Sequence, residues 1–486
     1  MSISVVADFI LALYTISLSI LLIYSTHGFI MLFYKYRYRN VSHDLTTVDF
    51  NQIVTIQLPL YNEMYMAERL IDAVCKLDYP KESLEIQVLD DSTDETSRIV
   101  SKRINKKLAE GFDIKHIQRN NRNGYKAGAL KEGLEKAKGN FIAIFDADFI
   151  PSPDFLKKTL SHFYKSDIGM VQTRWTHLNE NLSILTKVQA FALNGHFAIE
   201  QKVRNDAGFF INFNGTGGIW RKECILNAGN WETDTITEDL DLSYRAQMKG
   251  WKFIYLKDVT TAAELPENIS AIKSQQFRWT KGAIETAKKL LPTVWHSDLS
   301  LRLKLQSTLH LTNNFVFPFV ILTSILNVPM LFIKNTGNYN LYFQLSSIFI
   351  IAFISTFLFY TIAQKGIHLD WKKRSLIFPV FLAGTMGLSL SNTKAVLEGI
   401  ANKKSEFVRT PKFRTNGSNI IQNKYFSGGN FSALLILEIT FAAYSLLGVV
   451  ISIYYLEVSA FPFNFMFFIG FFSVAMLSLK DVFIKK

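Results

Sequence analysis

Two pairs of carboxylates stand where strand-like segments of this sequence end. "LDDSTDET" contains Asp90 and Asp91, and "FDADF" contains Asp146 and Asp148. Because strand side chains alternate between two faces, Asp146 and Asp148 point the same way. Two carboxylates held close together repel unless a hard cation neutralises them, and Mg²⁺ or Mn²⁺ on diphosphate oxygens meets that need. The alternative is that these acids are solvated or cap helices.

Three further segments carry groups that suit the same chemistry. In "RNNRNGYKAGAL", Lys126 precedes a helix start, and an ammonium beside helix N-terminal amides favours phosphate. In "PLYNE", Tyr61 and Glu63 could stack on and hydrogen-bond a nucleobase. In "TITEDLDLSYRAQMKGW", Glu238 and Asp239 open a helix. A carboxylate there could cap the helix or take a proton from an attacking hydroxyl. Each segment alone is also consistent with an ordinary loop or cap.

The stretch "SQQFRWTKG" predicts a helix with an unusual face. Gln275, Arg278 and Trp279 lie at i, i+3 and i+4, so they share one side of the helix. An amide, a guanidinium and an indole suit a hydroxylated ring better than a protein core. An interfacial helix with a snorkelling Arg and a belt-type Trp explains Arg278 and Trp279, but it does not explain Gln275.

Short apolar segments must position these groups. They alternate with helical stretches, and the strand-like ones are 52–60, 84–91, 112–118 and 140–148. This alternation predicts a parallel, doubly wound sheet. Polar loops follow the carboxyl ends of the strands, where open α/β sheets bind ligands. Amphipathic helices are expected at 181–201 and 272–291.

Long apolar runs flank this α/β region. The chain has 486 residues, of which 49% are hydrophobic. We expect five membrane spans, at 5–33, 309–333, 341–363, 431–456 and 460–479. Basic residues flank 375–397 on both sides, so we interpret it as an interfacial or re-entrant helix; six spans is the alternative. The basic run 34–39 puts the N-terminus outside and the following domain in the cytoplasm.

The net charge of +12 admits two classes of protein. One is a nucleic-acid binder, and the other is a membrane protein with basic cytoplasmic flanks. The apolar runs favour the membrane protein, so no nucleic-acid partner is expected. Cys75 and Cys224 form no spacing motif, which fits a reduced, cytoplasmic location for the soluble part.

Taken in order, these motifs resemble those of the processive family 2 glycosyltransferases, the cellulose, hyaluronan and chitin synthases. DD, DxD, TED and QxxRW follow one another within a membrane-flanked α/β domain. "GYKAGAL", "QTRWTHLN" and "FNFNGTGGIWR" are most similar to glucomannan and xyloglucan-backbone synthases and their bacterial relatives. "FVRTPK" (407–412) resembles the gating loop of cellulose synthase, with Arg409 in place of a Val.

The resemblance implies a fold and a domain organisation. It predicts a membrane protein with an α/β GT-A-type (doubly wound, Rossmann-like) cytoplasmic catalytic domain and an α-helical transmembrane region with interface helices. The expected division is a transmembrane helix at 1–40, the catalytic domain with interface helices at 41–300, and a channel region of four spans at 301–486. The channel region would include an interface helix at about 375–400 and a gating loop at about 403–416.

The resemblance also implies roles for the candidate residues. Asp239 would be the general base that deprotonates the acceptor hydroxyl. Asp146 and Asp148 would hold Mg²⁺ or Mn²⁺. Residues expected to bind the nucleotide are Tyr61, Glu63, Asp90, Asp91, Lys126, Phe407, Thr410 and Lys412. Residues expected to bind the acceptor are Glu238, Gln275, Arg278 and Trp279.

The resemblance finally implies an activity. The chain would polymerise a β-linked glucan or mannan from UDP-glucose or GDP-mannose, with β-1,4 as the expected linkage. It would also move the polymer across the plasma (inner) membrane. Its partners would be the donor, the polysaccharide acceptor and membrane lipid, with accessory export subunits as further candidates. The rival hypotheses are a single-sugar transferase to a polyprenyl phosphate carrier, a β-1,3 or mixed-linkage glucan synthase, and a transporter or scaffold with an inactive domain.

Overall fold

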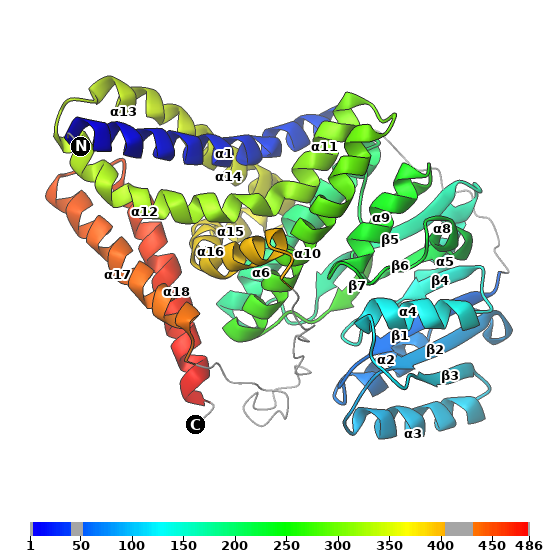
Figure 1. The fold of residues 1–486 in the computed structure, drawn as a ribbon. Coiled ribbons are helices and arrows are strands. Elements are labelled where there is room, and N and C mark those ends of the chain that lie inside the picture. Colours follow the sequence, from blue (N-terminus) through cyan, green and yellow to red (C-terminus); the bar gives the residue numbers. More distant parts are fainter. Residues whose placement is uncertain (1–2, 40–51, 404–430, 485–486) are drawn as a thin grey trace.

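A computed structural model describes residues 3–39, 52–403 and 431–484. In this part of the chain, a seven-stranded sheet lies beside a large group of helices (Figure 1). The strands are β1 (Val54–Leu60), β2 (Leu84–Asp90), β3 (Asp113–Gln118), β4 (Phe141–Ile144), β5 (Ile168–His177), β6 (Gly218–Arg221) and β7 (Lys252–Ala263). Their order across the sheet is β3-β2-β1-β4-β6-β5-β7.

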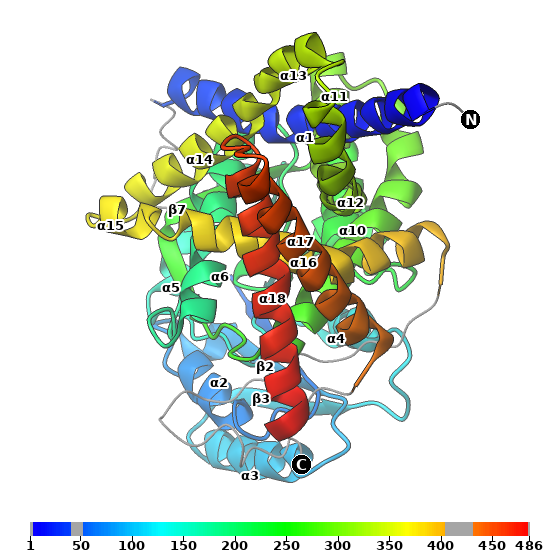
Figure 2. The ribbon, with the colours of Figure 1, turned by 90° about the vertical axis from the view of Figure 1, so that its left-hand side faces the viewer.

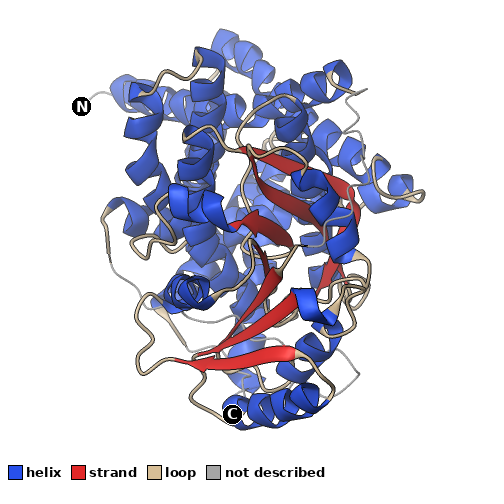
Figure 3. Ribbon diagram, turned by 90° about the vertical axis from the view of Figure 1, so that its right-hand side faces the viewer, coloured by secondary structure: helices blue, strands red, loops and turns tan. Residues whose placement is uncertain are grey.

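The first four strands form the parallel half of the sheet. β1 pairs in parallel with β2 and with β4, and β2 pairs in parallel with β3. The chain moves outward from β1 to β3 and then returns to add β4 on the other side of β1. The gap between the ends of β1 and β4 is therefore a topological switch point, where open α/β sheets bind ligands. β6 runs antiparallel to β4 and β5, so the complete sheet, seen in Figure 3, is mixed.

Helices cover both faces of the parallel half, which confirms the doubly wound prediction. Along β4, Phe141 and Ala143 enter one apolar core, while Ile142 and Ile144 enter the other. This alternation is the period-two pattern of a strand buried on both sides. The first core contains residues of α2 (Ala67–Val74) and α3 (Thr96–Ala109). The second contains residues of α4 (Tyr125–Lys136) and α9 (Glu238–Met248).

The remaining elements of the α/β region connect the sheet to the helices. Short helices are η1 (Lys81–Ser83), α5 (Phe155–Leu160), η2 (Ser161–Phe163) and α8 (Lys222–Asn227). After β5 the chain forms α6 (Ile184–Gly195), the π-helical segment η3 (His196–Gln201) and α7 (Lys202–Asp206). After β7 it forms the 28-residue α10 (Ile269–His296). Both amphipathic predictions therefore correspond to helices, each longer than expected.

Six helical stretches in the described residues are long and apolar enough to cross a membrane. They are Ser4–Arg37, Leu301–Asn335, Asn340–Lys365, Trp371–Ile400, Ala433–Tyr454 and Phe461–Ile484. Their helices are α1 (Ile3–Arg37), α11 (Leu301–Thr312), η4 (Asn313–Phe315), α12 (Val316–Asn335), α13 (Asn340–Ser346), η5 (Ser347–Phe349), α14 (Ile350–Lys365), α15 (Trp371–Ser375), α16 (Phe378–Ile400), α17 (Ala433–Tyr454) and α18 (Phe461–Ile484).

α16 corresponds to the segment expected at the membrane interface. By length and composition it belongs with the six candidate spans. Its neighbours are α10, α12 and α18, and Figure 2 shows it running across behind α17 and α18. At Gly387 and Gly470, α16 and α18 approach so closely that a Cβ on Gly387 would lie 2.2 Å from the Gly470 carbonyl oxygen. α16 thus connects α10 to the carboxyl-terminal helices.

Candidate active site

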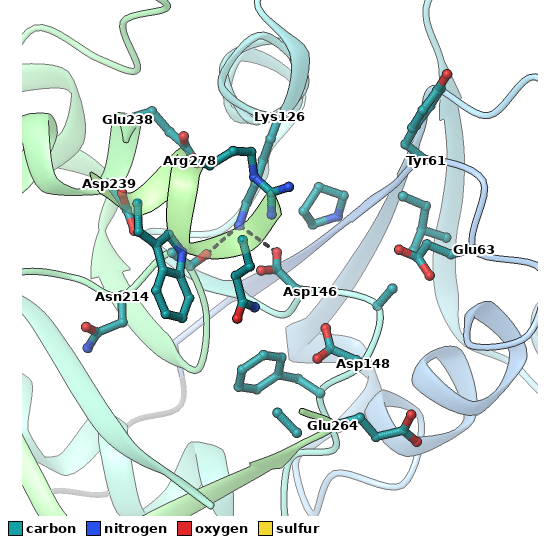
Figure 4. Close-up of a pocket in the computed structure, with 18 of the residues that line it drawn as sticks. Tyr61, Glu63, Lys126, Asp146, Asp148, Asn214, Glu238, Asp239, Glu264 and Arg278 are labelled. Atoms are coloured by element: carbon teal, nitrogen blue, oxygen red, sulfur yellow. Dashed lines mark hydrogen bonds and ion pairs between the residues drawn. The ribbon is translucent and has the colours of Figure 1, made fainter. Parts of the chain in front are cut away.

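A pocket opens at the switch point, beyond the carboxyl ends of β1 and β4 (Figure 4). Its wall combines the loops after these strands with the start of α9 and one face of α10. The predicted residues that line it are Tyr61, Glu63, Asp91, Lys126, Asp146, Asp148, Glu238, Asp239, Gln275, Arg278 and Trp279. Residues up to 220 positions apart in the sequence, from 59 to 279, therefore meet in one site.

The loop after β1 forms the part of the wall that carries Tyr61 and Glu63. The Arg122 guanidinium carbon lies 3.3 Å from the centroid of the Tyr61 ring. Burial lowers the pKa of Arg122, although the nearby Tyr61 and Asp91 raise it. Sequence reasoning noted the basic loop around Arg122 without selecting this residue. The stacking with Tyr61 depends on a contact across 61 positions of sequence, which no local spacing reveals.

The structure separates Asp90 from Asp91. Asp90 is 2% exposed and does not line the pocket. Its carboxylate accepts hydrogen bonds from the Ser92 N–H (2.9 Å) and the Ser97 hydroxyl (2.6 Å). His116 Nε2 lies 2.8 Å from it. In this structure the Asp90 carboxylate therefore points toward α3 and β3, away from the pocket, and its expected contact with the nucleotide stays a prediction.

Asp91 points the other way and lines the pocket. Arg119 Nε donates to Asp91 Oδ1 at 2.8 Å, and Arg119 Nη2 also donates to Oδ2, so the pair is bidentate. Arg119 donates further to the carbonyl oxygens of Asn123 and Tyr125. The Asp91 carboxylate thereby holds the loop that precedes α4 against the end of β2. Bidentate pairs of this kind give geometric precision as well as energy.

Asp146 and Asp148 lie in the turn that follows β4, and not on the strand as predicted. Both still line the pocket. Lys126 Nζ donates to Asp146 Oδ1 at 2.5 Å and to the Gly215 carbonyl oxygen at 2.8 Å. Although burial opposes the charge on Lys126, the Asp146 carboxylate raises the pKa of Lys126 above its usual value. Two carboxylates and one ammonium therefore lie together at the end of β4.

Glu238 and Asp239 occupy the first turn of α9. Asp239 Oδ1 accepts the N–H of Leu240 at 2.9 Å, which leaves Oδ2 facing the pocket region near Gly215. Burial raises the pKa of Asp239, and burial together with the Asp239 charge raises the pKa of Glu238. Lys126 opposes both shifts. A buried carboxyl group with a raised pKa is suited to proton transfer near neutral pH.

A glycine turn closes the pocket beside Asp239. Gly215 has φ +79°, and a Cβ there would lie 3.0 Å from Asp239 Oδ2 and 3.4 Å from Lys126 Nζ. Only glycine combines this backbone conformation with the required space. Thr216 Oγ1 accepts the Asp146 N–H at 2.9 Å, so the same turn also holds the acidic turn after β4.

Gln275, Arg278 and Trp279 all face the pocket from α10. The helix begins with Asn268 as its N-cap, whose side chain accepts the Ala271 N–H at 2.8 Å. Burial lowers the pKa of Arg278 to about 10, while the charges of Glu238 and Asp146 oppose this shift. The polar face of this helix therefore has a position within the site, as its residue types indicated.

Close packing holds α10 against the start of α9. A Cβ on Gly282 would lie 2.5 Å from Thr237 Cγ2 and 3.0 Å from the Thr237 nitrogen. The Thr237 and Thr286 hydroxyls are 3.1 Å apart. Since Thr237 precedes Glu238 directly, this contact sets the position of the acidic pair relative to the face of α10.

A second acidic group lies near the site but is neutralised. Glu232, Asp234 and Asp241 bring three carboxylates within reach of one another. Lys289 Nζ lies 2.5, 2.8 and 2.9 Å from them, respectively, and Arg245 pairs with Asp241 at 2.6 Å. These cations take the place that a metal ion would need, so the group serves as an ion-pair network between α9 and α10.

The three remaining predicted residues, Phe407, Thr410 and Lys412, lie outside the described residues. Other pocket residues were not selected from the sequence. They include Arg122, Phe149, Trp175, His177, Asn214 and Glu264. The segment "FNGTGGIWR" (213–221), which carries part of the family resemblance, contains Asn214, and this was the available signal for it.

Comparison with known proteins agrees with the fold and identifies a family. A model of the family described as "Glycosyltransferase like family 2" matches residues 52–282, and one described as "Cellulose synthase" matches residues 223–485. Glucomannan 4-beta-mannosyltransferase 1 of Oryza sativa subsp. japonica is 37% identical over 378 residues, covering 74% of this chain and 69% of that protein. Glucomannan 4-beta-mannosyltransferase 7 of Arabidopsis thaliana is 41% identical over 251 residues, covering 51% and 45%.

Among solved structures, a mannosyltransferase from Pyrobaculum calidifontis in complex with GDP-Man and Mn²⁺ has a TM-score of 0.56 at 18% identity. The match covers 80% of this chain and 100% of that one, and it establishes a shared fold. The fold and the ordered motifs define a membrane-associated GT-A glycosyltransferase. This chain belongs to the cellulose synthase-like branch of the family 2 glycosyltransferases. The matched stretches of several relatives span about half the length of those proteins.

Proposed function

We propose that this chain is a processive, inverting hexosyltransferase that builds a β-1,4-linked mannan or glucan from a sugar nucleotide. The observation that carries the proposal is the convergence of two kinds of group in one pocket. Acidic and basic groups suited to a nucleoside diphosphate lie at the ends of β1 and β4. Opposite them lie the Asp239 carboxylate, the proposed general base, and an amphipathic face of α10. The mannosyltransferase relatives favour GDP-mannose as the donor.

The donor side of the pocket is the end of the parallel sheet. Tyr61 and Glu63 would contact the nucleoside from the β1 loop, and Arg122 adds a desolvated cation over Tyr61. Asp91 would act beside them through its pair with Arg119. Asp90 would support this region indirectly, because its hydrogen bonds order the loop after β2. We also propose that Phe407, Thr410 and Lys412 close over bound nucleotide.

Asp146 and Asp148 fit a hard divalent cation. Both present carboxylate oxygens to the pocket from one turn, and such oxygens are the ligands that Mg²⁺ and Mn²⁺ prefer. When bound there, Mg²⁺ or Mn²⁺ would neutralise the diphosphate and stabilise the departing nucleotide. Lys126 supplies a second positive charge to the same region from α4. No separate acid is then required for the leaving group.

The acceptor side is formed by α9 and α10. Asp239 would take the proton of the attacking hydroxyl, because its carboxylate is buried and its pKa is raised toward neutrality. Attack from the side opposite the leaving group converts an α-linked donor into a β-linked product. Trp279 would offer a flat surface to the terminal sugar, with Gln275, Arg278 and Glu238 hydrogen-bonding around it.

The position of α10 supports export of the product. This helix contacts α9 on the catalytic side and α11, α16 and α18 on the helical side. A polymer end bound on its Gln275–Trp279 face would therefore lie beside the candidate spans. We propose that the chain is a multi-pass protein of the plasma (inner) membrane with its catalytic domain in the cytoplasm, and that the helices conduct the product outward.

A donor panel tests the proposal. Purified full-length protein is incubated with Mg²⁺ or Mn²⁺ and labelled GDP-mannose, GDP-glucose, UDP-glucose or UDP-N-acetylglucosamine, and the product is analysed for linkage. We expect a β-1,4-linked polymer that β-mannanase or β-1,4-glucanase digests. Labelled polyprenyl lipid would instead indicate a single-sugar transferase, β-1,3 linkage would contradict the proposed product, and no incorporation from any donor would overturn the proposal.

A further inference from the structure

His196 and Glu200 form a pair behind the wall of the pocket. Both stand in the π-helical segment η3, and such segments are frequent at functional sites. His196 Nδ1 lies 3.0 Å from Glu200 Oε2, and His196 Nε2 lies 3.0 Å from Asn214 Oδ1. One imidazole therefore joins a carboxylate to the amide of a residue that lines the pocket.

The Glu200 carboxylate orients this imidazole. Although burial opposes its charge, the hydrogen bond with His196 lowers the pKa of Glu200 well below its usual range. An ionised carboxylate accepts hydrogen bonds and cannot donate them, so the nitrogen that faces Glu200 carries a proton. The ring is thereby held with Nε2 directed at Asn214 Oδ1; because an amide oxygen only accepts, this contact is a hydrogen bond in the form of the ring in which Nε2 also carries a proton.

Several groups hold Asn214 in place, while its side-chain Nδ2 is left available to a ligand. Besides His196, the Asn212 side-chain amide contacts Asn214 Oδ1 at 3.0 Å. The Asn214 backbone N–H donates to Gln172 Oε1 at 3.0 Å. Among the described residues, the buried Asn214 Nδ2 has no hydrogen-bond partner. A sugar hydroxyl both donates and accepts, so it can satisfy whichever end of the amide is presented.

The position of Asn214 determines which sugar it can meet. The next residue, Gly215, lies against Asp239 Oδ2, and its carbonyl oxygen accepts a hydrogen bond from the Lys126 ammonium. Figure 4 shows Asn214 on the Asp239 side of the pocket, opposite Tyr61 and Glu63. That side belongs to the acceptor, whereas Tyr61 and Glu63 belong to the nucleotide.

We infer that Glu200 and His196 are positioning residues for the acceptor: they hold the Asn214 amide so that it binds a hydroxyl of the attacking sugar beside Asp239. The inference rests on the proposed function, because it takes the Asp239 side of the pocket as the acceptor side. Glu200 and His196 would touch no substrate themselves.

Two variants of the full-length protein test the inference. His196→Ala removes the link to Asn214, and Glu200→Gln removes only the charge. With GDP-mannose and Mn²⁺, we expect each to retain nucleotide affinity while the rate of polymer formation falls, by about tenfold for His196→Ala. The KM for an added β-1,4-manno-oligosaccharide should rise in the same variants. Lys202→Met is the matched control, because Lys202 and Asp206 form an ion pair of the same i,i+4 spacing that does not line the pocket.

A double variant shows whether the effect passes through Asn214. If it does, His196→Ala combined with Asn214→Ala loses no more activity than Asn214→Ala alone. Losses that multiply would overturn the inference, as would variants that polymerise and bind oligosaccharide like Lys202→Met. If His196→Ala fails to bind nucleotide, the isosteric Glu200→Gln variant tests the inference in its place. A wild-type protein that forms no polymer from any donor defeats the proposed function; unaffected variants of an active wild type defeat only the present inference.

Discussion

Lys126 Nζ lies 2.5 Å from Asp146 Oδ1, so an ammonium occupies one face of the carboxylate proposed to bind a metal ion. The same nitrogen donates to the Gly215 carbonyl oxygen at 2.8 Å. This side chain therefore joins α4, the turn after β4 and the glycine turn beside Asp239. A divalent cation at Asp146 and Asp148 must share Asp146 with Lys126.

Removal of Lys126 should affect metal binding and catalysis in opposite directions. In Lys126→Met, we expect the affinity for Mn²⁺ without nucleotide to rise up to about tenfold, because a competing charge is lost. Polymer formation should fall at least about tenfold, since the diphosphate loses a fixed cation. Mn²⁺ titration followed by electron paramagnetic resonance measures the first effect. Lys138→Met is the control, because Lys138 pairs with Asp113 at an exposed site; weaker Mn²⁺ binding in Lys126→Met would contradict the expectation.

Asp239→Asn should abolish transfer while sparing the donor site. The amide keeps the size of the side chain but cannot accept the proton of the attacking hydroxyl, and loss of a general base costs about 10²- to 10⁴-fold in rate. Nucleotide affinity should change little, because the residues proposed to bind the donor lie at the ends of β1 and β4. Calorimetric titration with GDP or UDP and a radiolabel assay for polymer separate the two quantities. Polymer formation near the wild-type rate would show that another group is the base.

The raised pKa of Asp239, to about 6, predicts opposite pH trends for rate and stability. A base works in its deprotonated form, so the rate should fall as pH decreases below about 6. For stability, the folded carboxyl keeps its proton above the unfolded pKa, so folding is favoured at low pH and this contribution is lost as pH rises through about 6. Asp239→Asn should therefore have a higher Tm than wild type at pH 7.5. An unchanged or lower Tm would argue against an ionised, buried Asp239.

Gly215→Ala should inactivate the protein through crowding at the site. The added methyl group would lie 3.0 Å from Asp239 Oδ2, and we expect at least about a hundredfold loss of polymer formation, as for other small misplacements of reacting groups. Gly208→Ala is the matched control. Gly208 has a similar φ of +71°, but nothing lies within 4 Å of its added Cβ. Equal losses of activity in both variants would assign the effect to backbone strain alone.

Local patterns were sufficient for β1 to β4 and for the polar face of α10, but β5, β6 and β7 were not predicted, nor was the mixed character of the sheet. The period-two alternation of β4 and the i, i+3, i+4 spacing of Gln275, Arg278 and Trp279 are both short-range properties of the sequence. The order of the motifs carried the resemblance that the family models confirm. The apolar composition of α16, in contrast, satisfies both a span and an interface helix, so composition alone does not choose between them.

Long-range contacts were not predictable in the same way. Asp90 and Asp91 are adjacent, and which one faces the pocket depends on how β2 pairs with β1 and β3. Asn214 and His196 meet across 18 residues that include a π-helical segment, for which the sequence offers no periodic signal. Arg122 lies over the Tyr61 ring although 61 positions separate the two residues, so no local pattern indicates this contact.

The pocket divides cleanly along the chain. Among the described residues of its lining, those proposed to face the nucleotide precede position 150, and those on the Asp239 side follow position 213. Between them lie α5, β5, α6 and α7, which contribute few groups to the pocket. Under the proposed function, donor choice and acceptor choice can therefore diverge separately under selection. Under the proposed function, we expect a hybrid gene joined between β4 and β5 to use the sugar nucleotide of the parent that supplies its first part and the growing glycan of the other parent.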